Sequence, residues 1–438
     1  MLQQPRLLFC CFDFVPTASM LSRRVVHYIK TLSEYFDISL MCIKNAEQPH
    51  IERYEKARIL RVPLKRGSFQ KRIAQFERAL RRQLESEEYA VVHSFDFASG
   101  RILADLKKQL GYRLVFEALT LRSQEWPHCQ PELALSAKTL ENIRQAESHA
   151  ASHATALIVA TQQQKNFLLG QGLCNVPVHV LFHPALPRKG IPPQPTGNFQ
   201  FLHLGGESQL AALQTILNAF ETIPQKSKIQ LALGGHYGAE SKAHLTALRE
   251  TLDSKGTVIW PTPEYETETS ALCAQADAAL LVLEHETRNV NFGGAMPELA
   301  DFFAWKLPIV ASDLPCVREF LGEEEALFFA PGDSAMLAKH MQTLADSLPL
   351  QKRLSQALAT KADAFGASRF IDETLRIYSP WMKKASQQTA EPPPEMTPSR
   401  AKTASFPAVS FPPRETVSPP SEQDTLIVLP DVASLPPE

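Results

Sequence analysis

Two glycine pairs stand where backbone groups alone can bind an anion. Gly205-Gly206 and Gly234-Gly235 each follow an apolar run typical of a buried strand and precede a helical pattern. N–H groups exposed at such a turn point toward a ligand at the start of the next helix, where the helix dipole favours negative charge. The pairs therefore predict phosphate-binding turns, although ordinary turn chemistry explains a Gly-Gly pair equally well.

A second chemical feature is a basic segment from Lys56 to Arg82, in which ten lysines and arginines stand against one acid, Glu77. The helical pattern at 69–86 adds apolar residues at helical spacing, as in helices that lie on anionic lipid. A helix whose apolar residues face a sheet has the same pattern, so a peripheral membrane contact through 56–82 stays an alternative to a solvated face. Nucleic acid is not an expected partner, because aromatic residues are sparse here and the net charge is −2.

The rest of the composition indicates a cytoplasmic chain, and no cofactor or metal is expected. Seven cysteines are scattered without C-x-x-C or zinc-finger spacing, which fits a reducing compartment. The N-terminal apolar run is interrupted by Asp13 and Pro16, unlike a signal peptide, and nowhere do about 18 apolar residues run together. We expect no spanning helix and, where the basic segment meets lipid, a location on the inner face of the membrane.

Two series of alternating strand and helix patterns must position these residues. The apolar runs of the first series lie at 6–12, 36–43, 58–64, 89–96, 113–119, 154–161 and 176–184. Those of the second lie at 199–206, 228–235, 256–263, 276–283, 307–313 and 325–333. Helical patterns separate the runs, including a long one at 133–152. This α/β alternation predicts two doubly wound Rossmann-like domains with parallel sheets, whose carboxyl ends face each other across a ligand-binding cleft.

A chain of 438 residues is too long for one core, since single cores stop growing at about 250–300 residues. The expected parts are an N-terminal domain at 1–190, a linker at 191–198, a C-terminal domain at 199–365, a helix at 366–385 and a tail at 386–438. Twelve of the 33 prolines fall in 391–438, a composition that predicts disorder. Within it, TLIVLP at 425–430 is either a strand able to join a sheet edge or a chance apolar cluster.

The segment PELADFFAWKLPIVASDLPCVREFLGEEEALFFAPGDSAMLA at 297–338 resembles the donor-site signature of the retaining glycosyltransferases of the GT-B fold. The resemblance extends over about residues 5–382 and implies that the helix at 366–385 packs back on the N-terminal domain. It also implies a nucleotide-sugar donor, a polysaccharide, lipid-linked or protein acceptor, retention of configuration, and no metal.

In that family a glutamate at the start of a helix binds the ribose hydroxyls, and the matching position, seven residues before Pro308, is Asp301. A carboxylate there accepts two charge-assisted hydrogen bonds, and the helix dipole favours its charge. The alternative is an ordinary acid of the first helical turn. A second family glutamate, which contacts the donor sugar, falls on Gly293, and Asn291 and Gly294 complete the expected donor-binding set.

Two cations that neutralise the donor diphosphate in the family are also replaced here, by Gly206 and Ala211. Their loss matters, because the departing nucleoside diphosphate gains negative charge in the transition state and fixed cations there are worth several kcal/mol. The N–H groups of the two glycine pairs are the expected substitutes.

On the acceptor side, VVHSFD at 91–96 and RLVFEAL at 113–119 resemble the family's strands that end at the cleft. The resemblance implies catalytic or acceptor-side roles for His93 and Glu117. As alternatives, His93 is a buried and satisfied histidine, and Glu117 caps the turn that follows it.

Two functions fit this chain. One is a glycosyltransferase, which the retained carboxylate favours; the other is a catalytically inactive GT-B scaffold that binds a glycan or protein and recruits a protein partner through 391–438. The three lost charged positions favour the scaffold. A dinucleotide-dependent dehydrogenase is excluded, since the first strand-to-helix turn, FVPTASMLSRR, lacks G-x-G-x-x-G.

Overall fold

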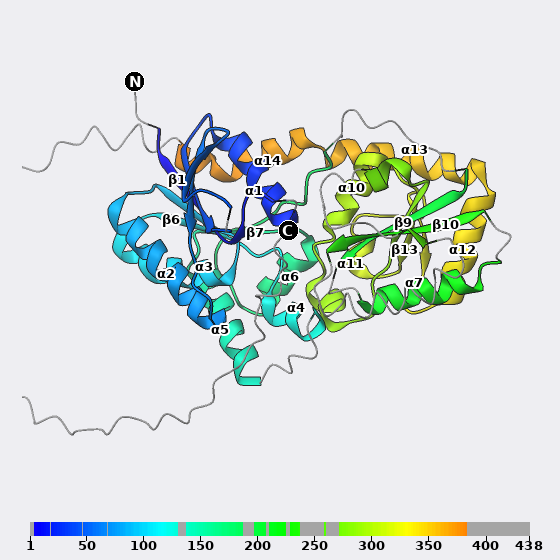
Figure 1. Ribbon diagram of the computed structural model, residues 1–438, viewed down its shortest axis with the longest axis horizontal. Coiled ribbons are helices and arrows are strands. Elements are labelled where there is room, and N and C mark those ends of the chain that lie inside the picture. The colour runs from blue at the N-terminus through cyan, green and yellow to red at the C-terminus, as the bar shows by residue number, and fades with distance from the viewer. Residues whose placement is uncertain are drawn as a thin grey trace, which may run out of the picture.

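The computed structural model describes residues 4–17, 19–45, 47–67, 69–129, 137–186, 197–206, 210–224, 228–236, 258–259 and 271–382. Most of the predicted linker, the helical pattern at 240–253 and the tail with its 425–430 segment lie outside this part. Figure 1 shows two lobes side by side along the long axis, each built on one sheet. The predicted α/β fold with two doubly wound domains is confirmed.

The N-terminal sheet has eight strands in the order β3-β4-β2-β1-β5-β6-β7-β8. Its strands are β1 (Arg6–Phe14), β2 (Asp37–Ile43), β3 (Ile51–Tyr54), β4 (Ala57–Val62), β5 (Val91–Ser94), β6 (Arg113–Glu117), β7 (Ala156–Val159) and β8 (Val178–Val180). All neighbours are parallel except β3, which pairs with β4 in antiparallel register. Strand β3 was not predicted, because IERY alternates between exposed and half-buried residues and lacks the apolar run of a central strand.

The helices of this domain are α1 (Met20–Leu32), α2 (Phe69–Ser86), α3 (Phe97–Leu110), α4 (Arg122–Cys129), α5 (Ala137–His153) and α6 (Gln162–Gly170). Side-chain caps start three of them, with Ser19, Asp96 and Thr161 accepting from backbone N–H groups three residues on. Helix α5 confirms the helix predicted at 133–152, whose first residues, 133–136, lie outside the described residues; the short helix α4 before it was not predicted.

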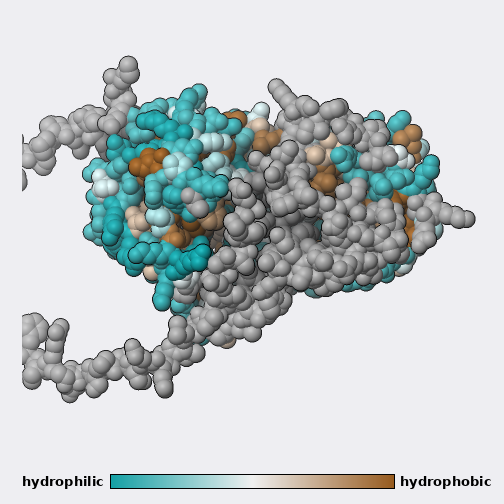
Figure 2. All heavy atoms as spheres, in the orientation of Figure 1, coloured by the Kyte–Doolittle hydropathy of each residue, from teal (hydrophilic) through white to brown (hydrophobic). Residues whose placement is uncertain are grey.

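Helix α2 shows how the basic segment is used. Its apolar residues Phe76, Leu80 and Leu84 are buried in the N-terminal core, so this face is already occupied by the protein itself. Its cationic residues Arg78 and Arg81 are exposed on the opposite side. The visible surface of this lobe in Figure 2 is largely hydrophilic. No helix of the described residues is long and apolar enough to cross a membrane.

The C-terminal sheet has six parallel strands in the order β11-β10-β9-β12-β13-β14. They are β9 (Phe199–Gly206), β10 (Ile229–His236), β11 (Val258–Ile259), β12 (Ala278–Leu281), β13 (Ile309–Ser312) and β14 (Ala326–Phe329). The described helices are α7 (Leu210–Thr222), the π-helical turn η3 (Arg288–Phe292), α10 (Pro297–Trp305), α11 (Pro315–Arg318), α12 (Ser334–Asp346) and α13 (Leu348–Ala364).

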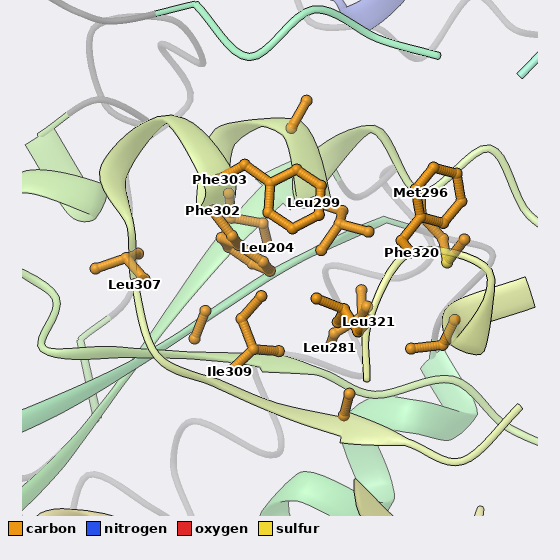
Figure 3. Close-up of a cluster of buried hydrophobic side chains, with 14 of the residues drawn as sticks. Leu204, Leu281, Met296, Leu299, Phe302, Phe303, Leu307, Ile309, Phe320 and Leu321 are labelled. Carbon is orange, nitrogen blue, oxygen red and sulfur yellow. The ribbon is translucent and has the colours of Figure 1, made fainter. Parts of the chain in front are cut away.

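Helix α10 is fixed to this sheet by one apolar face. Leu299, Phe302 and Phe303 are fully buried and recur at i, i+3 and i+4, so they lie together against Leu204 and Ile309 of the strands (Figure 3). A residue between them in sequence, such as Asp301, cannot share that face. The packing of α10 therefore turns the Asp301 carboxylate away from the sheet.

The last helix, α14 (Ala367–Met382), leaves the C-terminal lobe and lies over the N-terminal lobe beside α1 (Figure 1, orange). Its Phe370, Ile377 and Tyr378 are buried members of the N-terminal core. Residues 199–366 thus form an insertion between two parts of the same hydrophobic core, which ties the two lobes together.

Candidate active site

In doubly wound sheets ligands bind where the strand order reverses, at the carboxyl ends of the strands. The reversal points here lie between β1 and β5 and between β9 and β12. The structure places both glycine pairs inside strands, because Gly205 pairs with Gly235 in the β9–β10 ladder. The pairs therefore belong to the ends of β9 and β10 and not to the turns where they were expected, and the residues that follow, 207–209 and 237–257, lie outside the described part of the chain.

Gly234 is glycine for a packing reason. A Cβ at this position would lie 2.7 Å from Cδ1 of Leu272 and 2.8 Å from Cδ2 of Leu204, closer than real Cβ atoms approach. A side chain at this position would therefore require the buried side chains of Leu272 and Leu204 to shift. Gly234 is buried by apolar neighbours, and the part of the pair nearer the cleft is Gly235.

Asp301 lies on the cleft side of α10 and is held by the other domain. Nη2 of Arg23 in α1 lies 3.1 Å from Oδ2 of Asp301, and Nη1 lies 3.3 Å from Oδ1. Each side chain is 14% exposed, so this two-point ion pair is largely shielded from water. The first-turn acid of α10 is Glu298, one turn before Asp301, so Asp301 is not the ordinary first-turn acid that was one alternative.

The cavity beside this ion pair is small. It has a volume of about 30 Å³ and is lined by residues of both domains, among them His183, Pro184 and Pro297. Ligand pockets for molecules of nucleotide size occupy about 300–1,000 Å³. A nucleotide can reach Asp301 only if Arg23 and Asp301 separate.

The position of the missing sugar-binding glutamate is also filled by the other domain. Gly293 has φ +80°, and a Cβ there would lie 3.2 Å from Cδ of Gln163 in α6. The side-chain amide of Gln163 donates to the carbonyls of Asn289 and Val290, at 3.2 and 2.6 Å. Both the backbone conformation and the close approach of Gln163 select glycine.

The other two predicted donor-site residues flank Gly293. Asn291 is exposed on η3, and Gly294 is half-buried with its missing Cβ about 3.8 Å from Oδ1 of Asn289. The carbonyl of Gly293 accepts a hydrogen bond of 3.0 Å from Gln164, whose Oε1 in turn accepts from the N–H of Ala160. The segment at 288–294 is therefore hydrogen-bonded to the first turn of α6.

A buried ion pair braces the same loop. Nη1 of Arg288 in η3 lies 2.5 Å from Oε2 of Glu125 in α4, across the domain boundary, and its Nε donates to Glu286. Glu284 accepts at 2.6 Å from Thr215 of α7. The acids upstream of Gly293 thus have partners and are held away from the Gly293 position.

His93 and Glu117 are brought together, as their predicted positions on neighbouring strands require, but inside the N-terminal core. Nε2 of His93 lies 3.1 Å from Oε2 of Glu117, and both side chains are fully buried. The same oxygen accepts 2.8 Å from the hydroxyl of Tyr28, while Oε1 pairs with Arg24. On its other side, Nδ1 of His93 lies 2.6 Å from the hydroxyl of Tyr378 in α14.

The charges of this network follow from burial and pairing. Burial raises the pKa of the Glu117 carboxyl, but the Arg24 charge and the His93 ring outweigh it, so the pKa is lowered and Glu117 is ionised. Burial lowers the pKa of His93 more than Glu117 raises it, so the ring is neutral. Arg24 also donates to the carbonyls of Leu181 and Phe182, at 2.8 and 3.2 Å.

Arg23, Arg24, Gln163 and Arg288 were not among the predicted site residues. A signal for the first two exists in the sequence, since adjacent arginines near the start of a helix oppose the helix dipole and need anionic partners. Nothing local in the sequence points to Gln163 or to the pairing of Arg288 with Glu125, because these partners are more than a hundred residues apart. Among the described residues, no three His, Cys, Asp or Glu side chains gather as metal ligands.

Two family models match the chain. Residues 21–182 match a glycosyl transferase 4-like domain, and residues 199–347 match the glycosyl transferases group 1 domain. No curated protein matches the chain by sequence.

Solved structures share the fold. Sucrose-phosphate synthase from Thermosynechococcus elongatus has a TM-score of 0.70 at 15% identity, covering 86% of this chain and 99% of that one. HepE from Anabaena in complex with UDP and glucose has 0.62 at 14%, covering 86% and 100%. The catalytic domain of starch synthase IV from Arabidopsis thaliana, bound to ADP and acarbose, has 0.63 at 10%, covering 87% and 100%. At these identities the likeness establishes the fold alone.

Proposed function

This chain belongs to the GT-B glycosyltransferases, with a glycosyl transferase 4-like domain followed by a group 1 domain, and on that premise we propose that it transfers a sugar from a nucleotide-sugar donor to a glycan, lipid-linked or protein acceptor with retention of configuration. The observation that carries the proposal is the Arg23–Asp301 ion pair. It places a cation of the N-terminal domain against the carboxylate that matches the family's ribose ligand.

Arg23 supplies the charge that the C-terminal domain has lost. The family's donor cations are replaced by Gly206 and Ala211, so the nearest guanidinium to Asp301 comes from α1. When the donor enters, its ribose hydroxyls take the place of Arg23 on Asp301, and the released guanidinium turns to the diphosphate. A planar guanidinium binds phosphate oxygens at two points as it does a carboxylate.

The chemistry then requires little from the protein beyond placing charge. The bond from the anomeric carbon to the phosphate oxygen breaks through an oxocarbenium-like state, and its electron pair leaves with the nucleoside diphosphate. The acceptor hydroxyl bonds to the anomeric carbon on the same face and gives its proton to the departing phosphate. Arg23 stabilises the charge that develops on that phosphate, which is where preorganised cations lower the barrier. No metal is assigned a role.

The buried His93–Glu117 pair acts in this proposal as a positioning group. Through Arg24 and Tyr28 it holds α1 against the sheet, and α1 carries Arg23. Neither side chain reaches solvent, so neither is assigned a contact with the donor.

Calorimetric titration of the full chain with UDP, GDP and ADP, each paired with its nucleoside, tests the proposal. One nucleoside diphosphate should bind. Arg23→Gln should weaken that diphosphate about 10- to 100-fold, the range of one charge-assisted contact, and should not weaken the nucleoside, which has no phosphate for Arg23 to bind and no longer has to displace Arg23 from Asp301. Asp301→Asn should weaken both ligands, and Asp346→Asn, an exposed change in α12 of the same domain, should weaken neither.

Two results contradict the proposal. Tighter binding of the nucleoside diphosphate by Arg23→Gln would show that Arg23 only competes with the ribose for Asp301 and does not bind the phosphates. Absence of binding for every nucleotide at millimolar concentration would favour the second candidate, a catalytically inactive scaffold. A specific observation supports that candidate, since Gln163 fills the space beside Gly293 where the family's sugar-binding glutamate stands.

A further inference from the structure

A groove of about 440 Å³ runs along the outer edge of β8, between that strand and helix α14. We call it the β8 groove. Its apolar lining comes from β8 and the residues after it, from the end of α13 and from α14, and includes Val178, Val180, Phe182, Phe365 and Phe370. It is distinct from the small cavity at Asp301, with which it shares His183. Its volume is in the range of pockets that hold ligands or short peptides.

Strand β8 is the last strand of the eight-stranded sheet, so one of its two edges has no neighbouring strand among the described residues. The N–H of Leu181 bonds to Val159, and the carbonyl of Pro177 accepts from Leu157, which directs alternate residues toward β7. The N–H and C=O groups of Val178 and Val180 therefore point outward, into the groove side, and the described residues include no strand that pairs with them. Such an edge is a template for an added strand.

The rim of the groove is on balance cationic. Lys165, Arg369 and Arg376 line it against two carboxylates, Glu319 and Glu373. Both carboxylates have partners within the protein: Glu319 accepts from the N–H groups that start α6, and Glu373 pairs with Arg376. Burial, then the charges of Arg376 and Lys165, lower the pKa of His179 in the strand, so its ring adds no charge. An occupant with flanking acids is favoured.

We propose that the occupant is residues 425–430 of this same chain, added as a strand to the free edge of β8. This segment, TLIVLP, is six residues long with four consecutive apolar side chains, and residues 420–438 around it carry four acids and no lysine or arginine. Glu422 and Asp424 precede the apolar stretch and Asp431 follows it, which places negative charge at both ends of the inserted strand, against the cationic rim. Main-chain pairing supplies affinity, and the aromatic lining of the groove selects the apolar side chains.

The chain can reach the site. Helix α14 lines the groove and ends at Met382, six residues after Arg376, so the tail starts beside its own docking surface. From Met382 to Thr425 there are 43 residues, whose fully extended length of about 140–155 Å far exceeds the distance to be covered, because the tail starts beside the groove. A tether of this kind gives an effective concentration on the order of 1 mM. A segment with an intrinsic dissociation constant of about 0.1 mM would then be docked in about ten chains of every eleven.

Hydrogen exchange of the full chain tests the inference. In the wild type the amides of Val178 and Val180 should exchange slowly, and Val428→Asp, which puts a charge into the apolar stretch, should speed that exchange about tenfold. Val417→Asp is the matched control, since it makes the same change in the tail outside the segment. Arg369→Glu should also speed exchange, and Asp431→Lys in the same chain should restore part of the protection.

Each other outcome overturns the inference. Equal exchange in the wild type, Val428→Asp and Val417→Asp would show that the segment does not cover β8. Protection that disappears on dilution to nanomolar protein would show that a second copy supplies the strand. The test uses no nucleotide, so its failure leaves the proposed sugar transfer untouched, and failure of nucleotide binding leaves this inference untouched.

Discussion

Replacement of Glu117 by glutamine separates a structural role of this carboxylate from a catalytic one. The change keeps the size of the side chain and removes only its charge, so no cavity forms. It leaves the Arg24 guanidinium fully buried with two carbonyl acceptors, at Leu181 and Phe182, and no counter-ion. The pKa of Glu117 is lowered, so at neutral pH the wild type has the full ion pair to lose.

The expected loss is about 3–5 kcal/mol of unfolding free energy, the usual cost of leaving a buried charge without its partner. An exposed pair gives the contrast. Asp313, which is 48% exposed and pairs with Arg318, should cost less than about 1 kcal/mol as Asp313→Asn. Glu117→Gln combined with Arg24→Met should lose less than the sum of the two single changes, because the double variant buries no lone charge.

Urea titration with hydrogen exchange of peptides from residues 91–117 measures this loss in the N-terminal domain alone. The two-domain chain need not unfold in one step, which is why a local probe is required. If Glu117→Gln stays within 1 kcal/mol of the wild type and still abolishes sugar transfer, the carboxylate contacts substrate and the positioning role assigned to it is wrong.

Three further predictions concern buried groups. Burial raises the pKa of Glu147 to about 7. The contribution of this carboxyl to stability is therefore complete below about pH 4.3 and is lost as the pH rises through 7. Glu147→Gln should remove that decline, worth about 3 kcal/mol, in unfolding curves measured from pH 4.5 to 8. Burial lowers the pKa of His203 to about 4. The contribution of the neutral ring to stability is therefore complete above about pH 6.5 and is lost as the pH falls toward 4. His203→Leu should flatten the acid side of the same unfolding curves, and an unchanged slope would contradict the burial of this ring. Gly234→Ala should cost about 1–3 kcal/mol through its clash with Leu272, whereas Gly170→Ala, which has open space around it, should cost nothing in thermal melts.

The sheets were predictable because their central strands are buried on both faces and appear as continuous apolar runs. That signal weakens at the edges, which is why the alternating strand at Ile51–Tyr54 was missed. Asp301 lies on the predicted helix but not in its first turn, and the glycine pairs lie at the ends of strands where turns were expected. In each case a local pattern located the element and left its ends uncertain by a few residues.

The contacts around the site could not be predicted from local patterns. Arg23 meets Asp301 from 278 positions away, and His93 meets Tyr378 from 285 positions away. Such pairs depend on how the two domains and α14 pack, which one sequence does not encode in spacing. The reason Gly293 replaces an acid is of the same kind, since Gln163 occupies the space from another domain.

The path of α14 has a consequence for synthesis on the ribosome. The N-terminal lobe emerges first, yet Phe370, Ile377 and Tyr378 of its core are made only after the whole C-terminal lobe. Until then the nascent lobe exposes the apolar core surface that α14 will cover, and His93 lacks the hydroxyl of Tyr378 as a partner. Partly folded chains with exposed apolar surface are those that aggregate and engage chaperones. A chain that stalls or is cut before residue 370 therefore leaves an unfinished first domain, although every one of its strands has been translated.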